Sequence, residues 1–184
     1  MKHAGTKTVE TARLTLRALV PTDAAMMFRN WTSDENVTCF LRWDAHKSVE
    51  DTQKMVAKWV ESYRQDSTYY WGMYLKNGEM IGSIGVTVTS EQDLKGELGY
   101  KLGSRWWNRG YATEAAKAVI DYMFRNTDME RLDAVYSAKN PASGRVMEKA
   151  GMNCEGLLRH YYKTRDGFHD CYIYALLRED WEKL

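Results

Sequence analysis

One stretch of the chain combines a strand, a polar loop and a helix start in a way that suits phosphate binding. The stretch runs from Gly96 to Phe124, and its loop reads SRWWNRGYAT from Ser104 to Thr113. A helix start leaves backbone N–H groups without partners and carries a partial positive charge. A glycine at the helix entry, here Gly110, lets an anion approach those N–H groups closely. The sequence therefore predicts an anion-binding loop at this helix start.

Two better-known kinds of phosphate-binding loop do not match this stretch. A P-loop requires Lys-Ser or Lys-Thr after its second glycine, and a dinucleotide-binding loop requires three spaced glycines. The loop here has Gly110 as its single glycine and no such lysine pair. On the local residues alone, an ordinary loop with solvated Arg105 and Arg109 remains the alternative.

A second candidate segment, NPASGRVMEKAGM, runs from Asn140 to Met152. Asn140 is a favourable helix N-cap, and the proline after it suits the first helical position. Gly151 follows where a left-handed C-cap belongs. Ser143 is therefore expected in the first turn of a short helix, where its hydroxyl can serve either the helix backbone or a ligand.

The elements around both segments follow from hydrophobic periodicity. We expect strands at Arg13–Leu19, Tyr69–Leu75, Met80–Thr89, Glu97–Leu102, Arg131–Ser137, Gly156–Thr164 and Phe168–Leu177. We expect helices at Ala24–Asn30, from the N-cap Ser48 to about Arg64, after Thr113 and after Asn140, with Trp31–Lys47 irregular and one last turn in the tail.

This order of elements predicts one α/β domain over residues 1–184, with its core at about 13–177. Hairpins and strand–helix–strand links together imply a mixed sheet with helices on both faces. Alternation in the strand Glu97–Leu102 puts Glu97 and Lys101 on one face and Tyr100 on the other.

The composition is that of an ordinary globular protein and excludes several classes of function. Charged residues make up 28% and hydrophobic residues 44% of the chain, and the formal net charge is +1. This balance gives no argument for a nucleic-acid or membrane partner, and no apolar run approaches about 18 residues. Cys39, Cys154 and Cys171 are widely spaced, and no metal-ligand spacing appears, so we expect a cytoplasmic protein without a metal.

The segment from Trp107 to Ala115, WNRGYATEA, resembles the acetyl-CoA-binding signature of the GNAT N-acetyltransferases. Trp107 stands where Gln or Arg is usual, and in this it is similar to the RimJ/RimL-like branch. The segment Asn140–Met152 resembles the second motif of that branch. The resemblance covers nearly the whole chain and implies a GNAT-like fold, with a central mixed, mostly antiparallel twisted sheet of about seven strands flanked by helices.

The resemblance also implies the residues that bind acetyl-CoA. Backbone groups near Tyr100–Leu102 would pair with pantetheine, which would lie beside β-strand residues as an added strand does. The loop N–H groups would hold the pyrophosphate, and Asn140 would touch the pantetheine arm. A pair of basic residues on the helix after Asn140 would meet the 3′-phosphate. The residues assigned in this way are Tyr100, Lys101, Leu102, Trp107, Asn108, Arg109, Gly110, Tyr111, Ala112, Thr113, Asn140, Ser143, Arg145 and Lys149.

Acetyl transfer needs a base for the acceptor amine, a donor to the developing oxyanion and protonation of the leaving sulfur. Glu97 is the candidate general base if burial raises its pKa, and an exposed strand residue is the alternative. Ser143 resembles a serine of the branch's second motif that would hydrogen-bond the sulfur. The alternative acids are Tyr100, Tyr136, Tyr161 and Tyr162. No cysteine has a nucleophile context, so direct transfer is expected.

The acceptor is expected to be a primary amine, either a peptide N-terminus or a small molecule. Trp31, Phe40, Trp43, Tyr69 and Trp71 are candidates for its pocket or for the core, and Trp31–Lys47 is a candidate lid. A non-catalytic CoA sensor is the alternative function, and a nucleotide-phosphate binder is a weaker one. Tyrosines of the final hairpin also suggest a homodimer, although alternation does not separate a partner surface from the core.

Overall fold

The computed structural model describes residues 1–184, and its centre is one eight-stranded sheet in the order β1-β2-β3-β4-β5-β6-β8-β7. The strands are β1 Val9–Glu10, β2 Leu14–Arg17, β3 Tyr69–Leu75, β4 Met80–Ser90, β5 Lys95–Leu102, β6 Arg131–Ser137, β7 Asn153–Thr164 and β8 Gly167–Leu177. The helices are α1 Ala24–Met27, α2 Glu35–Thr38, α3 Val49–Ser62, α4 Tyr111–Asn126, α5 Pro141–Lys149 and α6 Arg178–Trp181. All neighbouring strands are antiparallel except β5 and β6.

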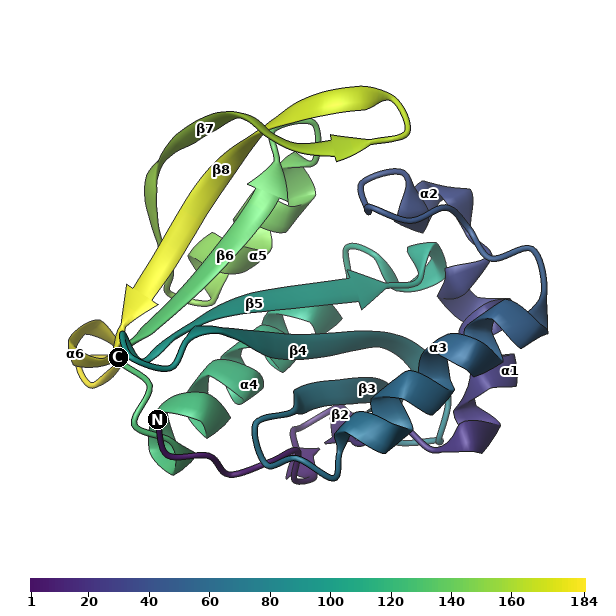
Figure 1. Cartoon of the computed structure of the whole chain (residues 1–184), viewed down its shortest axis with the longest axis horizontal. Coiled ribbons are helices and arrows are strands. Elements are labelled where there is room, and N and C mark those ends of the chain that lie inside the picture. Colours follow the sequence, from purple (N-terminus) through teal and green to yellow (C-terminus); the bar gives the residue numbers. More distant parts are fainter.

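The single parallel pair is also the place where the sheet opens. Strands β5 and β6 are in register only over Lys95–Glu97 with Arg131–Asp133, and beyond this they diverge (Figure 1). Strand β5 stays paired with β4 along its whole length. From Leu98 to Leu102, β5 therefore has a strand neighbour on one side and none on the other.

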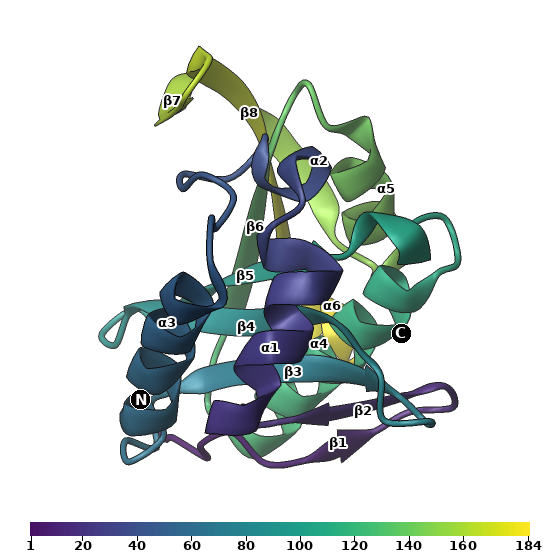
Figure 2. The same ribbon diagram turned by 90° about the vertical axis from the view of Figure 1, so that its right-hand side faces the viewer.

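Helices cover both faces of the sheet. The end view shows α1 and α3 on one side of β3–β5, and α4 on the other (Figure 2). Helix α4 buries Ala115, Val119, Ile120 and Met123 against the larger core cluster, which includes Leu98 of β5. Each fully buried side chain of this kind contributes about 1.5–3 kcal/mol, so α4 and the loop before it are held firmly on the sheet.

The second face has a smaller core beneath α1 and α3. Met27 and Val56 pack there against Tyr70 and Tyr74 of β3. The odd-numbered residues of β5, Glu97 and Lys101 among them, lie on this face, as the alternation predicts. One face of β5 thus packs against the core beneath α4, and the other faces α1 and α3. The charged side chains of β5 lie only on the face toward α1 and α3.

The fold confirms a mixed, mostly antiparallel sheet with helices on both faces. It has eight strands rather than about seven, because the two-residue β1 was not predicted. The predicted helix Ala24–Asn30 is wrong in its extent, since α1 ends at Met27 and a π-helical turn continues from Phe28 to Thr32. The segment Trp31–Lys47, predicted as irregular, contains the short helix α2. No helix has both the length and the apolar character required to span a bilayer.

Candidate active site

The loop before α4 presents a row of free backbone donors. Gly110 adopts φ +79° and ψ 2°, and Asn108 also has a positive φ of 58°. The first helical hydrogen bond runs from Glu114 N–H to the Gly110 carbonyl, 3.0 Å. The N–H groups of residues 108–113 donate to no protein acceptor. With Asn108, Arg109 and Gly110 exposed, this arrangement can accept an anion at the positive end of the helix.

The same loop is anchored by the turn between β1 and β2 and by the end of β5. Arg13 donates from Nη1 to the Arg109 carbonyl at 2.9 Å and from Nε to Glu114 at 2.6 Å. Glu114 also accepts from the Thr11 hydroxyl at 2.7 Å. The indole N–H of Trp107 donates to the Leu102 carbonyl at 2.8 Å, which joins the loop to the end of β5. These bonds fix the donors before any ligand arrives, so little ordering is required on binding.

A cavity of about 510 Å³, here called the inter-strand cleft, lies where β5 and β6 diverge. It joins residues of β5, β6, α5, the Phe40–Trp43 segment and the β7 hairpin. Tyr100 and Ser143 meet in it: the two hydroxyl oxygens are 2.7 Å apart, and the Tyr100 hydroxyl also donates to the Ser143 carbonyl at 2.9 Å. Burial raises the pKa of Tyr100 to about 12, so its hydroxyl keeps its proton at neutral pH.

Glu97 lies at the base of this opening. Burial raises the pKa of its carboxyl, and the neighbouring Asp133 raises it further, while Arg42 and Lys95 oppose the shift. Asp133 is held by two cations, with Lys95 Nζ at 3.1 Å and Arg131 Nε at 2.6 Å. Glu97 has no such partner. A partly desolvated, unpaired carboxylate is a better base than an exposed one.

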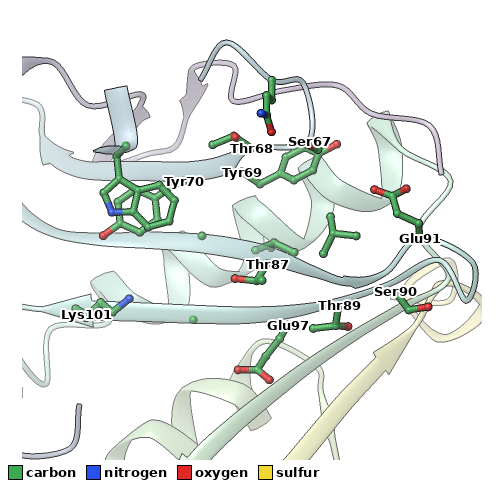
Figure 3. Close-up of a pocket in the computed structure, with 16 residues that line it drawn as sticks. Ser67, Thr68, Tyr69, Tyr70, Thr87, Thr89, Ser90, Glu91, Glu97 and Lys101 are labelled. Carbon is green, nitrogen blue, oxygen red and sulfur yellow. The ribbon is translucent and has the colours of Figure 1, made fainter. Parts of the chain in front are cut away.

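A second cavity of about 640 Å³, here called the outer cleft, lies over β3–β5 on the side of α3 (Figure 3). Glu97, Gly99 and Lys101 line both cavities, so the two clefts meet along β5. A molecule in the outer cleft would therefore reach the inter-strand cleft from the opposite side to α4. Such an arrangement lets two substrates enter from different faces and meet beside Glu97.

The structure brings five of the predicted site residues together in one cleft. Glu97, Tyr100, Lys101, Asn140 and Ser143 line the inter-strand cleft. Tyr136, Tyr161 and Tyr162 line it as well, but only Tyr100 bonds to Ser143. Arg145 and Lys149 are exposed on α5 and line neither cleft; Lys149 borders a separate hollow beside α4 and α6.

The aromatic candidates for the acceptor pocket divide between the site and the core. Trp31 and Trp71 are fully buried core residues. Phe40 and Trp43 line the inter-strand cleft, whereas Tyr69 lines the outer cleft while packing in the core. The Tyr162 hydroxyl donates to the Phe40 carbonyl at 3.3 Å, so the Phe40–Trp43 segment closes one end of the inter-strand cleft against β7.

Both predicted N-cap positions are confirmed, but neither side chain makes a cap bond. Asn140 occupies the N-cap position of α5, with φ −118° and ψ 67°, and makes no side-chain cap bond. Ser48 likewise makes no cap bond to the α3 backbone, and its hydroxyl donates to Asp51 instead. The amide of Asn140, which lines the cleft, is therefore free for a ligand.

Asp133 and Arg42 are site residues that the sequence reasoning did not identify. Asp133 is buried. The sequence feature that could have identified it is a carboxylate among the apolar residues in the middle of the strand RLDAVYS. Arg42 lines the inter-strand cleft and opposes the raised pKa of Glu97. It comes from a segment without regular structure, where no periodicity reports which side chains face a site.

Comparison with known proteins identifies the family to which this site belongs. The model of the GNAT acetyltransferase domain matches residues 13–153. The chain belongs to the GNAT family. Both sequence motifs lie within the matched range, and the free donors before α4 and the open β5 edge lie there too. The family activity is acetyl-CoA-dependent N-acetyl transfer, so this GNAT protein is an acyltransferase enzyme.

Named relatives of this GNAT chain agree with that assignment. The probable N-acetyltransferase YjcK of Bacillus subtilis is 31% identical over 148 residues, 78% of this chain and 80% of that protein. The ribosomal protein uS5-alanine N-acetyltransferase of Escherichia coli is 31% identical over 146 residues, 77% of this chain and 74% of that protein. A GNAT acetyltransferase structure from Bacillus anthracis has a TM-score of 0.83 and 27% identity, covering 94% and 99% of the two chains. The resemblance to the RimJ/RimL-like branch is confirmed.

Proposed function

We propose that this enzyme moves the acetyl group of acetyl-CoA directly to a primary amine, with a protein N-terminal α-amine as the preferred acceptor and a small amine as the alternative. The Escherichia coli relative, a ribosomal protein uS5-alanine N-acetyltransferase, supports the preference for a protein amine. The observation that carries the proposal is the meeting of two clefts beside Glu97, one bordered by α5 and one open on the side of α3.

The residues present fit coenzyme A. The free N–H groups of residues 108–113 suit the pyrophosphate. The unpaired edge of β5 from Leu98 to Leu102 offers main-chain groups to the pantetheine amides, and the free amide of Asn140 offers another contact. Arg145 stays a prediction for the 3′-phosphate, while Lys149 has less support because it borders a different hollow.

Glu97 is proposed as the general base. When bound, acetyl-CoA supplies the acetyl group as a thioester with a thiol leaving group. The acceptor ammonium must lose a proton before its nitrogen can bond to the acetyl carbon. A Glu97 oxygen accepts this proton, directly or through one water. Burial raises the pKa of the Glu97 carboxyl and so brings it closer to the pKa of the acceptor amine. The new N–C bond replaces the C–S bond, and the electron pair of that bond stays on sulfur.

Tyr100 is proposed as the proton donor to the leaving thiolate, with Ser143 as its hydrogen-bond partner. Its hydroxyl lies in the inter-strand cleft and is protonated at neutral pH, since its pKa is about 12. The Ser143 hydroxyl donates to the Tyr100 oxygen at 2.7 Å, and the Tyr100 proton, which points to the Ser143 carbonyl at 2.9 Å, would turn from that carbonyl to the sulfur. Sequence reasoning gave Ser143 the direct role; the geometry favours Tyr100 as donor and Ser143 as the group that orients it.

The experiment combines binding and turnover. Calorimetry should show CoA binding, and thiol release from acetyl-CoA should depend on an added peptide with a free N-terminus. Glu97→Gln should keep CoA affinity and lower kcat by about 10²-fold or more, the usual contribution of a general base. Turnover that is unchanged in Glu97→Gln would refute the assignment of the base. CoA binding without acetylation of any amine would instead favour the non-catalytic sensor.

A further inference from the structure

Glu97, Gly99 and Lys101 form a row on one face of β5, at the floor of the outer cleft. Alternate residues of a strand share a face, and all three line both clefts. Gly99 leaves the middle of the row bare, because a Cβ at this position would meet nothing within 4 Å. Figure 3 shows the Glu97 and Lys101 side chains along the same strand. Along the strand, the row therefore presents the carboxylate of Glu97, then the bare backbone of Gly99, then the ammonium of Lys101.

The ammonium of Lys101 has no counter-charge within the protein. It forms no ion pair or hydrogen bond, and burial alone lowers its pKa. Its nitrogen lies 5.7 Å from the centroid of the Tyr70 ring, which stacks on Trp59 at 3.8 Å. Lys95, on the same face, is by contrast paired with Asp133. A cation that is partly desolvated and unpaired in an open cleft would gain most from an anionic ligand.

We propose that the acceptor is a peptide whose α-amine lies at Glu97 and whose acidic side chain, at the third or fourth position, lies at Lys101. This inference rests on the proposed function and gives the substrate class for the same site. Four residues of β5 span about 13 Å, and an extended peptide covers that length in about four residues. Lys101 can reach back along the strand, which brings the third position within range.

The open backbone at Gly99 completes the argument. A peptide chain that connects the two charged ends must cross the strand surface between them, and a side chain there would obstruct it. A small amine without a second charged group would use Glu97 alone and leave Lys101 without a partner. The row therefore selects for an acceptor with two functional groups at a fixed separation.

The first test compares short peptide amides as acceptors for the wild-type enzyme. Ala-Gly-Gly-Asp-amide should have a kcat/KM about tenfold higher than Ala-Gly-Gly-Asn-amide, as expected for one charge-assisted hydrogen bond. Ala-Asp-Gly-Gly-amide should lose most of this advantage, because its carboxylate lies too close to the amine. Equal kcat/KM for the Asp and Asn tetrapeptides would overturn the inference while acetylation itself upholds the proposed function. No acetylation of any peptide would overturn the inference, and thiol release with small amines alone would then leave a small amine as the acceptor of the proposed function.

Variants then assign the preference to Lys101. Lys101→Met should remove the preference for Asp over Asn, and Lys101→Glu should favour Ala-Gly-Gly-Lys-amide. Lys58→Met, which removes an exposed lysine of α3, should change neither. Gly99→Ala should raise KM for the peptide, since the added methyl group occupies the open space that the peptide would cross. An Asp preference that persists in Lys101→Met would refute the role of Lys101.

Discussion

Glu97 and Asp133 are register partners on the parallel strands β5 and β6, and they are the last pair before the two strands separate. Asp133 is neutralised by Lys95 and Arg131, whereas Glu97 is left unpaired at the mouth of the opening. Two carboxylates in adjacent positions differ in role because only one has counter-charges. The position of the proposed base is thus set by the point at which the sheet divides.

Asp133→Asn is predicted to make Glu97 more acidic. The change removes a neighbouring negative charge and leaves Lys95 without its carboxylate partner, and both effects favour the ionised form of Glu97. The acidic limb of the kcat/KM profile should move to lower pH. A pH profile checks this shift, with Glu61→Gln on α3 as the control. If the acidic limb does not move, or moves to higher pH, Asp133 does not raise the pKa of the group that controls this limb.

Glu97→Gln is predicted to be inactive yet no less stable. Burial raises the pKa of Glu97 in the folded state above its unfolded value, so the folded chain binds the proton more tightly. The ionised carboxylate therefore destabilises the fold once the pH exceeds its folded pKa. The stability gain of Glu97→Gln should be present at neutral pH and disappear below about pH 4, the unfolded pKa range of a glutamate. Urea unfolding at both pH values measures it.

Gly110→Ala is predicted to weaken both the fold and CoA binding. A non-glycine residue in the left-handed region costs roughly 1–2 kcal/mol, and Gly110 has φ +79°. For a chain of this size that cost lowers Tm by about 2–8 °C. Gly78→Ala is the matched control, since Gly78 has φ +86° with open space around it and lies in a distant hairpin. Both variants should lose stability, and only Gly110→Ala should lose CoA affinity by calorimetry.

Tyr100→Phe is predicted to slow turnover with little effect on CoA affinity. Loss of a positioned general acid typically costs about 10²-fold or more in rate. Ser143→Ala should cost less, because the Tyr100 hydroxyl keeps its bond to the Ser143 carbonyl. Tyr172→Phe is the control, since the Tyr172 hydroxyl bonds to nothing in the cleft. Initial rates of thiol release show which variant loses more turnover. If Ser143→Ala is slower than Tyr100→Phe, Ser143 is the donor.

Local pattern predicted much of this fold. Strands Tyr69–Leu75 and Arg131–Ser137 match the expected bounds, the first because it is rich in aromatic residues that favour strands. The helix after the loop was also predicted, but it begins at Tyr111, directly after Gly110, rather than after Thr113. These features depend on residues within a few positions of one another.

Features that depend on distant residues were not predicted. The register of Glu97 with Asp133 joins strands separated by α4, and nothing in either strand encodes where the pairing ends. The π-helical turn at Phe28–Thr32 orients Asn30, whose amide donates to the Met80 carbonyl at 2.7 Å, so tertiary contact overrides the helical pattern.

The separation of β5 from β6 has a mechanical consequence. Strands β1–β5 and β6–β8 form two sub-sheets that share only three register pairs. A pantetheine chain hydrogen-bonded along the free edge of β5 would add a rigid wall to the gap and restrict the motion of one sub-sheet against the other. Amide hydrogen exchange in β6 should then slow on CoA binding. The cosubstrate would stabilise the arrangement of the two sub-sheets as well as donate the acetyl group.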